Sequence, residues 1–182
     1  MHHIFALFVG LLASVSGSFA PVCHATEQQL RVMSHDSFNV STELIASFER
    51  QHGVTVRFLK AGDAGSALVQ AILSKDNPLA DVFYGVDNTF MSRALQGDIL
   101  IPYRSPLLDS VPQELVLDPS YRLVPINYGD VCLNYDKEWF SARNQAPPAD
   151  LDDLLKPRYR GLTVVQNPAT SSPGLAFLLA TI

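Results

Sequence analysis

Four groups of polar residues in this sequence have side chains suited to binding a small charged molecule. Carboxylates attract cations and accept hydrogen bonds, while hydroxyls beside the free N–H groups at a helix start favour phosphate or carboxylate. The groups are His35-Asp36-Ser37, Asp63-Ala64, Asp87-Asn88 and Thr170-Ser171-Ser172. No G-x-G-x-x-G, P-loop, G-x-S-x-G, H-E-x-x-H or Cys-x-x-Cys motif accompanies them. We therefore expect reversible binding, without catalysis and without a cofactor.

Each group also has a purely structural interpretation, and the sequence leaves both open. Asp63 and Asn88 are favourable N-caps, so their side chains could serve only their helices. Thr170-Ser171-Ser172 precede Pro173, a residue favoured at the first helical position, and they form either a helix cap or an anion cradle. His35 has no partner at metal-ligand spacing, so no metal site is expected.

The elements that must position these groups alternate between strand and helix. Their order, βαβαβα, predicts an α/β fold with a mostly parallel sheet and helices on both faces. Ligands bind at the carboxyl edge of such sheets, which is where the polar groups fall. Apolar runs and capping residues predict strand 30–33, a helix from Ser41 to Gly53, strand 54–59, a helix after Asp63, strand 81–85 and a helix from Asn88 to Gly97.

The second half continues this alternation after a connection rich in Pro, Ser and Asp at residues 101–119. The last helix, opened by Ser172-Pro173, carries an apolar stripe without a C-cap, so we expect the 182 residues to be a fragment of a longer protein. The other elements predicted here are strands 121–127, 130–135 and 162–165 and a short helix at 151–155.

The first 25 residues predict an export signal rather than a part of the fold. Residues 4–15 are almost continuously apolar, and no Lys, Arg, Asp or Glu precedes Glu27. Small residues flank His24, which favours cleavage after Ala25. The apolar run is too short to span a membrane. We therefore expect a periplasmic or otherwise extracytoplasmic protein.

The charge balance excludes one class of partner. The chain has 13 Lys+Arg and 18 Asp+Glu, a formal net charge of −5, and the basic residues are scattered. Binding to a phosphate backbone requires a basic surplus, so nucleic acid is not an expected partner.

Five longer motifs follow one another along the segment after residue 25. They are Asp36-Ser37-Phe38, residues 80–88 (ADVFYGVDN), Tyr128-Gly129-Asp130, residues 134–137 (NYDK) and residues 167–175 (NPATSSPGL). In this order they resemble the thiamine-binding periplasmic components of bacterial ABC importers. The resemblance implies a type II periplasmic-binding fold, in which two doubly wound α/β lobes are joined by a hinge. The first lobe would span residues 26–128, and residues 129–182 would form the hinge strand and the start of an incomplete second lobe.

The resemblance also implies a function and a site. A monomeric protein of this family captures thiamine or its phosphates between the lobes and delivers it to an ABC permease. His35 stands where the family commonly has an aromatic residue beside the ligand, and Asp63, followed by Ala64, stands where a carboxylate faces the aminopyrimidine. Ser171 matches a hydroxyl that contacts phosphate, whereas Thr42 replaces an aromatic residue of some relatives, which argues against tight phosphate clamping. The remaining predicted ligand-binding residues are Asp36, Ser37, Asp87, Tyr128, Thr170 and Ser172.

Two alternatives fit part of the pattern. A binding protein for ferric ion or an inorganic anion shares the fold, but the anion version needs only the Thr170–Ser172 cradle and leaves Asp63 unexplained. A secreted thiaminase-like enzyme would need a nucleophile, for which Cys132 is the candidate. The apolar neighbours of Cys132, Val131 and Leu133, favour instead a buried strand residue.

Overall fold

A computed structural model describes residues 28–182, so the export signal predicted at residues 1–25 lies outside the described residues. Short elements follow one another along this part of the chain. In order they are β1 (Gln28–Ser34), α1 (Thr42–His52), β2 (Val54–Lys60), α2 (Ala64–Leu73), β3 (Val82–Phe83), α3 (Met91–Gln96), the 3₁₀ turns η1 (Pro106–Ser110) and η2 (Gln113–Leu115), α4 (Lys137–Ala142), the 3₁₀ turns η3 (Asp152–Leu155) and η4 (Pro157–Tyr159), and α5 (Ser172–Ala180).

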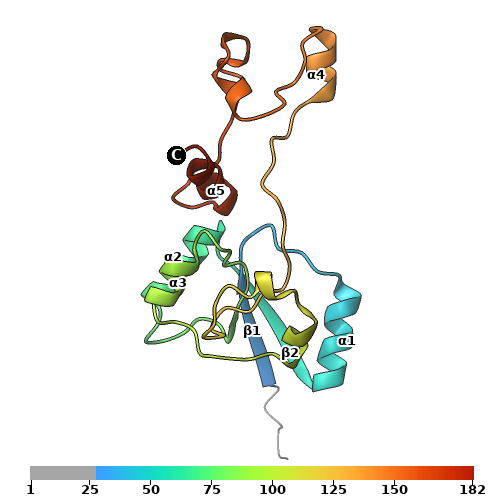
Figure 1. The fold of residues 1–182 in the computed structure, drawn as a ribbon. Helices are drawn as coiled ribbons and strands as arrows, with labels where there is room; N and C mark the ends of the chain where they lie inside the picture. Colours follow the sequence, from blue (N-terminus) through green and yellow to red (C-terminus); the bar gives the residue numbers. More distant parts are fainter. Residues whose placement is uncertain (1–27) are drawn as a thin grey trace, which may run out of the picture.

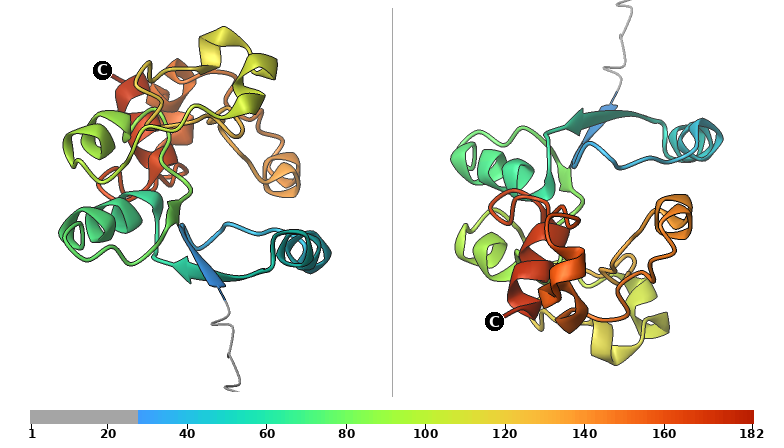
Figure 2. Two further views of the ribbon diagram at one scale, coloured as in Figure 1. Left: turned by 90° about the horizontal axis from the view of Figure 1, so that it is seen from below. Right: turned by 90° about the horizontal axis from the view of Figure 1, so that it is seen from above.

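The three strands form a parallel sheet in the order β2-β1-β3, which confirms the predicted fold class. β1 pairs with β2 from Gln28↔Val54 to Ser34↔Lys60, and with β3 at Val32↔Val82 and Met33↔Phe83. Helix α1 lies on one side of the strands and α2 and α3 on the other (Figures 1 and 2). This doubly wound arrangement brings the carboxyl ends of all three strands to one edge.

Of the three helices predicted in the first half of the chain, two begin where their capping residues predict. Helix α1 begins after Ser41, whose hydroxyl accepts a hydrogen bond from the Leu44 N–H at 3.3 Å, and it ends at Gly53 in a left-handed conformation with φ 64°. Helix α2 begins after Asp63 as predicted, although the Asp63 carboxylate makes no capping hydrogen bond. The predicted start of α3 at Asn88 is wrong, because α3 begins at Met91.

The core of this sheet layer contains a segment from the far end of the chain. Leu68, Phe90 and Ala94 form a buried cluster, and Leu175 of α5 packs against it. Helix α5 therefore lies over the carboxyl ends of the strands, beside α2 (Figure 1). Residues about 80 positions away in the sequence thus stabilise one apolar cluster by excluding water from it.

A second part of the chain leaves this layer and returns to it. Residues 124–136 run outward as an extended segment to α4, and residues 161–169 lead back to α5 (Figure 1). The predicted strands 121–127, 130–135 and 162–165 are wrong, since these segments pair with no strand in residues 28–182. The predicted helix 151–155 is the 3₁₀ turn η3. Tyr159, 2% exposed, anchors this outer part through its hydroxyl, which donates to the Ala146 carbonyl at 2.8 Å.

A buried carboxylate organises the loop that precedes the outward segment. Asp118 is 4% exposed and accepts hydrogen bonds from the Ser120 N–H and hydroxyl, the Arg122 N–H and the Leu123 N–H, at 2.7–3.0 Å. Burial alone raises the pKa of this carboxyl, but the hydrogen bonds outweigh burial, and the pKa lies below its ordinary value. The Arg122 guanidinium then reaches the Leu95 carbonyl at the end of α3, which joins the loop to the sheet layer.

Within residues 28–182, no helix combines the length and the apolar composition that crossing a bilayer requires.

Candidate functional site

The turn after β1 is tied directly to the turn after β2. The Asp36 N–H donates to the Gly62 carbonyl at 2.9 Å, and the Asp36 carboxylate accepts from the Gly62 N–H at 3.0 Å. The Lys60 ammonium also donates to the Asp36 carbonyl at 3.0 Å. Because both turns leave the same sheet edge, this network fixes the position of Asp63 relative to His35. The Asp36 carboxylate thus has a structural partner in the Gly62 N–H.

An aromatic group stands beside these turns. The His35 ring lies 5.9 Å from the Tyr84 ring and 6.4 Å from the Phe38 ring, between centroids, and His35 Nδ1 lies 2.9 Å from the Ser37 hydroxyl. Gly85, with φ 114°, makes room for it, since a Cβ there would stand 2.7 Å from His35 Cδ2. His35 and Ser37 are thereby placed together at the sheet edge, as the sequence predicts. Tyr84 is a further member of this group.

A second convergence joins the start of α2 to the loop before α5. The Gly65 N–H donates to the Thr170 carbonyl at 2.8 Å, and the Thr170 hydroxyl donates to Asp63 Oδ2 at 3.4 Å. The structure therefore brings Asp63, Ala64 and Thr170 into one place from positions 107 residues apart. Gly65 is a site residue that sequence reasoning missed, and the glycine inside the first turn of a helix was the available signal.

The Ser171 side chain makes its hydrogen bonds at the start of α5. Its hydroxyl donates to Gln166 Oε1 and accepts from the Gly174 N–H at 3.3 Å, and the residue is 4% exposed. It is therefore the N-cap of α5, one of the two interpretations that the sequence left open. Ser172 is the first residue of α5. No signal in the sequence singled out Gln166 as the partner of Ser171.

Two predicted residues stand apart from this convergence. The Asp87 carboxylate accepts from the Thr89 hydroxyl at 2.7 Å and from the Phe90 N–H at 3.2 Å, which orders the turn before α3. Tyr128 is 80% exposed on the outward segment. Its neighbour Asn127 donates to the Tyr84 hydroxyl at 2.9 Å, so this segment leaves the sheet layer next to the aromatic group.

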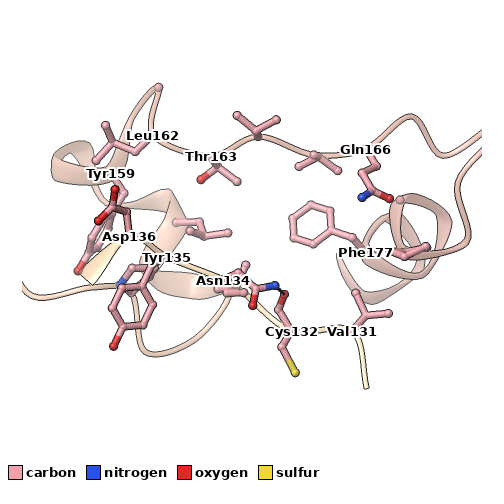
Figure 3. Close-up of a pocket in the computed structure, with 18 of the residues that line it drawn as sticks. Val131, Cys132, Asn134, Tyr135, Asp136, Tyr159, Leu162, Thr163, Gln166 and Phe177 are labelled. Carbon is pink, nitrogen blue, oxygen red and sulfur yellow. Dashed lines mark hydrogen bonds between the residues drawn. The ribbon is translucent and has the colours of Figure 1, made fainter. Parts of the chain in front are cut away.

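The cavities in the described part of the chain include two of about 530 Å³ each. The first lies between the extended segments 131–136 and 161–166 of the outer part, and Phe177 points into it (Figure 3). None of the predicted site residues lines this cavity. The second is an apolar groove along α2, lined by Gly65, Val69, Leu73 and Thr170 among others. The second cavity therefore touches the candidate site, and the first does not.

Cys132 lies on the outward segment. The predicted burial of Cys132 is wrong: the residue is exposed, because its segment has no neighbouring strand to cover it. Its sulfur points away from the first cavity (Figure 3). Its backbone carbonyl accepts a hydrogen bond from the Asn134 side-chain amide at 3.2 Å.

Over the described range, no group of three or more His, Cys, Asp or Glu side chains is arranged to hold a metal ion.

Comparison with known proteins places this geometry in a class. A family model described as bacterial extracellular solute-binding protein matches residues 77–182, more than half of the chain. The chain belongs to this family of extracellular solute-binding proteins. Relatives in sequence are the thiamine-binding periplasmic protein of Salmonella typhimurium, 27% identical over 158 residues, and that of Haemophilus influenzae, 26% identical over 175 residues. These alignments cover 82% and 93% of this chain but 45% and 50% of the relatives. The chain thus spans about half the length of the curated relatives it matches.

Solved structures agree on the fold. A periplasmic thiamin binding protein superposes with a TM-score of 0.64 at 23% identity, over 86% of this chain and 48% of that one. The periplasmic binding protein AfuA of Actinobacillus pleuropneumoniae, solved with fructose-6-phosphate, superposes with a TM-score of 0.58 at 24% identity, over 80% of this chain and 47% of that one. The fold is that of a type II periplasmic binding protein, present in part.

Proposed function

We propose that this chain is the ligand-capturing portion of an extracytoplasmic protein that binds thiamine or its phosphates and delivers them to an ABC permease. The observation that carries the proposal is the exposed Asp63 carboxylate at the carboxyl edge of the sheet, at the convergence of α2 with the loop before α5. The names of the relatives, which align over most of this chain, support thiamine as the ligand.

The chemistry of the site suits this ligand. Thiamine carries a permanently positive thiazolium ring and a flat aminopyrimidine with donors and acceptors. A carboxylate stabilises the positive charge and accepts from the amino group, and aromatic faces attract a cation. Asp63 supplies the carboxylate, and the group of His35, Tyr84 and Phe38 supplies aromatic surface at the same edge.

The proposed division of the chain and the proposed site stay as the sequence predicts them. The first lobe is residues 26–128, and residues 129–182 form the hinge strand and part of the second lobe. Asn127, bonded to Tyr84, supports the boundary, because it is the last residue of the outward segment with a side-chain hydrogen bond to the sheet layer. The proposed ligand-binding residues are His35, Asp36, Ser37, Asp63, Ala64, Asp87, Tyr128, Thr170, Ser171 and Ser172.

The proposed mechanism is capture without chemical change. The ligand enters between the lobes, the lobes close about the hinge, and the monomeric protein docks on a membrane permease. The family and the names of the relatives, which are binding proteins, support binding rather than thiamine cleavage.

Calorimetric titration of the full-length protein with thiamine, thiamine monophosphate, inorganic phosphate and ferric citrate tests the proposal. We expect saturable binding of thiamine or its monophosphate, and recovery of the intact ligand by chromatography. If the protein binds phosphate but not thiamine, it is an anion-binding protein. If it binds ferric citrate but not thiamine, it is an iron-binding protein. Release of pyrimidine and thiazole fragments would show an enzyme instead.

A further inference from the structure

Thr170 holds both polar groups that the convergence of α2 and the α5 loop presents. Its hydroxyl donates to Asp63 Oδ2, and its carbonyl accepts from the Gly65 N–H. Thr170 therefore supplies a donor to the Asp63 carboxylate and an acceptor to the Gly65 N–H. Thr170 thus covers the Gly65 N–H, and it engages one oxygen of the Asp63 carboxylate, which is otherwise exposed.

Packing holds Thr170 in this position. Gly65 is buried, and a Cβ built on it would stand 2.9 Å from the Thr170 carbonyl oxygen, 2.9 Å from the Ala169 carbonyl oxygen and 2.8 Å from Phe90 Cζ. The loop thus approaches α2 as closely as the backbone allows, because residue 65 is glycine. Leu175, one turn into α5, adds its contact with the apolar cluster of the sheet layer.

We propose that Thr170 is an internal competitor for the ligand, occupying Asp63 and the Gly65 N–H until the ligand displaces it. This inference rests on the proposed function and revises the role of one residue there: Thr170 occupies the proposed thiamine site instead of contacting the bound ligand. An aminopyrimidine carries an amino donor next to a ring nitrogen acceptor, which is the pair that Thr170 presents. The ligand can therefore replace both hydrogen bonds of Thr170 at once and leave no group unsatisfied.

The same competition selects against simple anions. Inorganic phosphate can replace the Thr170 carbonyl at the Gly65 N–H, but at neutral pH it meets the negative charge of Asp63. It also offers the carboxylate few donors in place of the Thr170 hydroxyl. Displacement of Thr170 thus costs more for an anion than for a ligand with adjacent donor and acceptor atoms.

The substitution Thr170→Val in the full-length protein tests the competition. Valine keeps the branched shape and the carbonyl but removes the hydroxyl that binds Asp63. Because a net hydrogen bond is lost only from the ligand-free state, thiamine should bind about three- to tenfold more tightly. Thr163→Val is the matched control: Thr163 is exposed on the returning segment, and we expect unchanged affinity.

A second measurement needs no ligand. Hydrogen exchange of the amides of residues 64–68 and 169–172 should be faster in Thr170→Val than in the wild type, and unchanged in Thr163→Val. Weaker thiamine binding by Thr170→Val would overturn the proposal and make Thr170 a ligand contact, and unchanged exchange would also overturn it. If wild-type protein binds no thiamine, the proposed function fails, while the exchange rates still decide whether the Thr170 hydroxyl closes the site.

Discussion

The side-chain amide of Asn127 donates to the Tyr84 hydroxyl at 2.9 Å, where the chain leaves the sheet layer. The Tyr84 ring in turn lies 4.5 Å from the Phe38 ring and 5.9 Å from the His35 ring, between centroids. One tyrosine therefore joins the aromatic group at the sheet edge to the start of the outward segment. Any ligand that stacks on this aromatic group therefore contacts Tyr84, the residue that holds the start of the outward segment through Asn127.

The first prediction concerns this link. Tyr84→Phe keeps the ring and removes the hydroxyl, so the stability of the sheet layer should fall by no more than about 1 kcal/mol, the scale of one partly exposed hydrogen bond. Hydrogen exchange in residues 124–136 should nevertheless become faster. Tyr103→Phe, at a tyrosine that is 63% exposed, serves as the control. Equal exchange in both variants would show that Asn127 does not hold the segment.

The second prediction separates binding from capping at Asp63. Asp63→Ala should reduce thiamine affinity by roughly 2–5 kcal/mol, because the ligand's buried donors lose a charged partner. The melting temperature should change little, since the Asp63 carboxylate makes no capping hydrogen bond in α2. Titration calorimetry and thermal unfolding measure the two effects, with the exposed Asp152→Ala as control. Unchanged affinity with a lower melting temperature would make Asp63 structural.

The third prediction concerns Ser171. Because its hydroxyl caps α5, Ser171→Ala should lower the free energy of unfolding by about 1 kcal/mol, as loss of an N-cap does. Ser92→Ala, exposed on α3, should leave stability unchanged. Comparing thiamine with thiamine monophosphate then tests the proposed phosphate contact. A loss of affinity confined to the monophosphate supports that contact, whereas equal losses restrict Ser171 to capping.

The fourth prediction concerns stability in acid. The pKa of Asp118 is lower in the folded chain than its ordinary value near 4, so the folded state binds this proton less readily than the unfolded state does. Its contribution is complete above about pH 4 and is lost as pH falls through the folded pKa. Asp118→Asn should reduce stability at pH 7 and flatten its decline below pH 4. Denaturant unfolding across this range is the measurement, and Asp76→Asn, at an exposed aspartate, should keep the wild-type decline.

The parts of the fold that sequence predicts well are those whose signals are local. Ser41 and Gly53 bound α1 because a cap and a left-handed glycine act within one turn of the helix. The predicted helix start at Asn88 is wrong because the preceding residue, Asp87, accepts the hydrogen bond of the Phe90 N–H in a turn. Helix α3 begins after this turn, at Met91. Apolar runs such as 162–165 indicate a strand only when a neighbouring strand is available for pairing. No strand in residues 28–182 pairs with them.

The candidate site was predicted in its parts but not in its contacts. The edge rule for parallel sheets places His35 and Asp63 near each other without any knowledge of side chains. The contact between Asp63 and Thr170 joins residues 107 positions apart and depends on the packing of α5, which no local pattern encodes. The role of Gly65 likewise depends on the loop that faces it.

The chain crosses between its inner and outer parts twice, outward along residues 124–136 and back along residues 161–169. A single connecting segment would let the outer part rotate in any direction. Two connecting segments, or tethers, restrict the rotation mainly to the axis that passes through both of them. Proteolytic cleavage of either tether would therefore not separate the two parts at once. Cleavage would instead let the outer part turn about the single segment that remains.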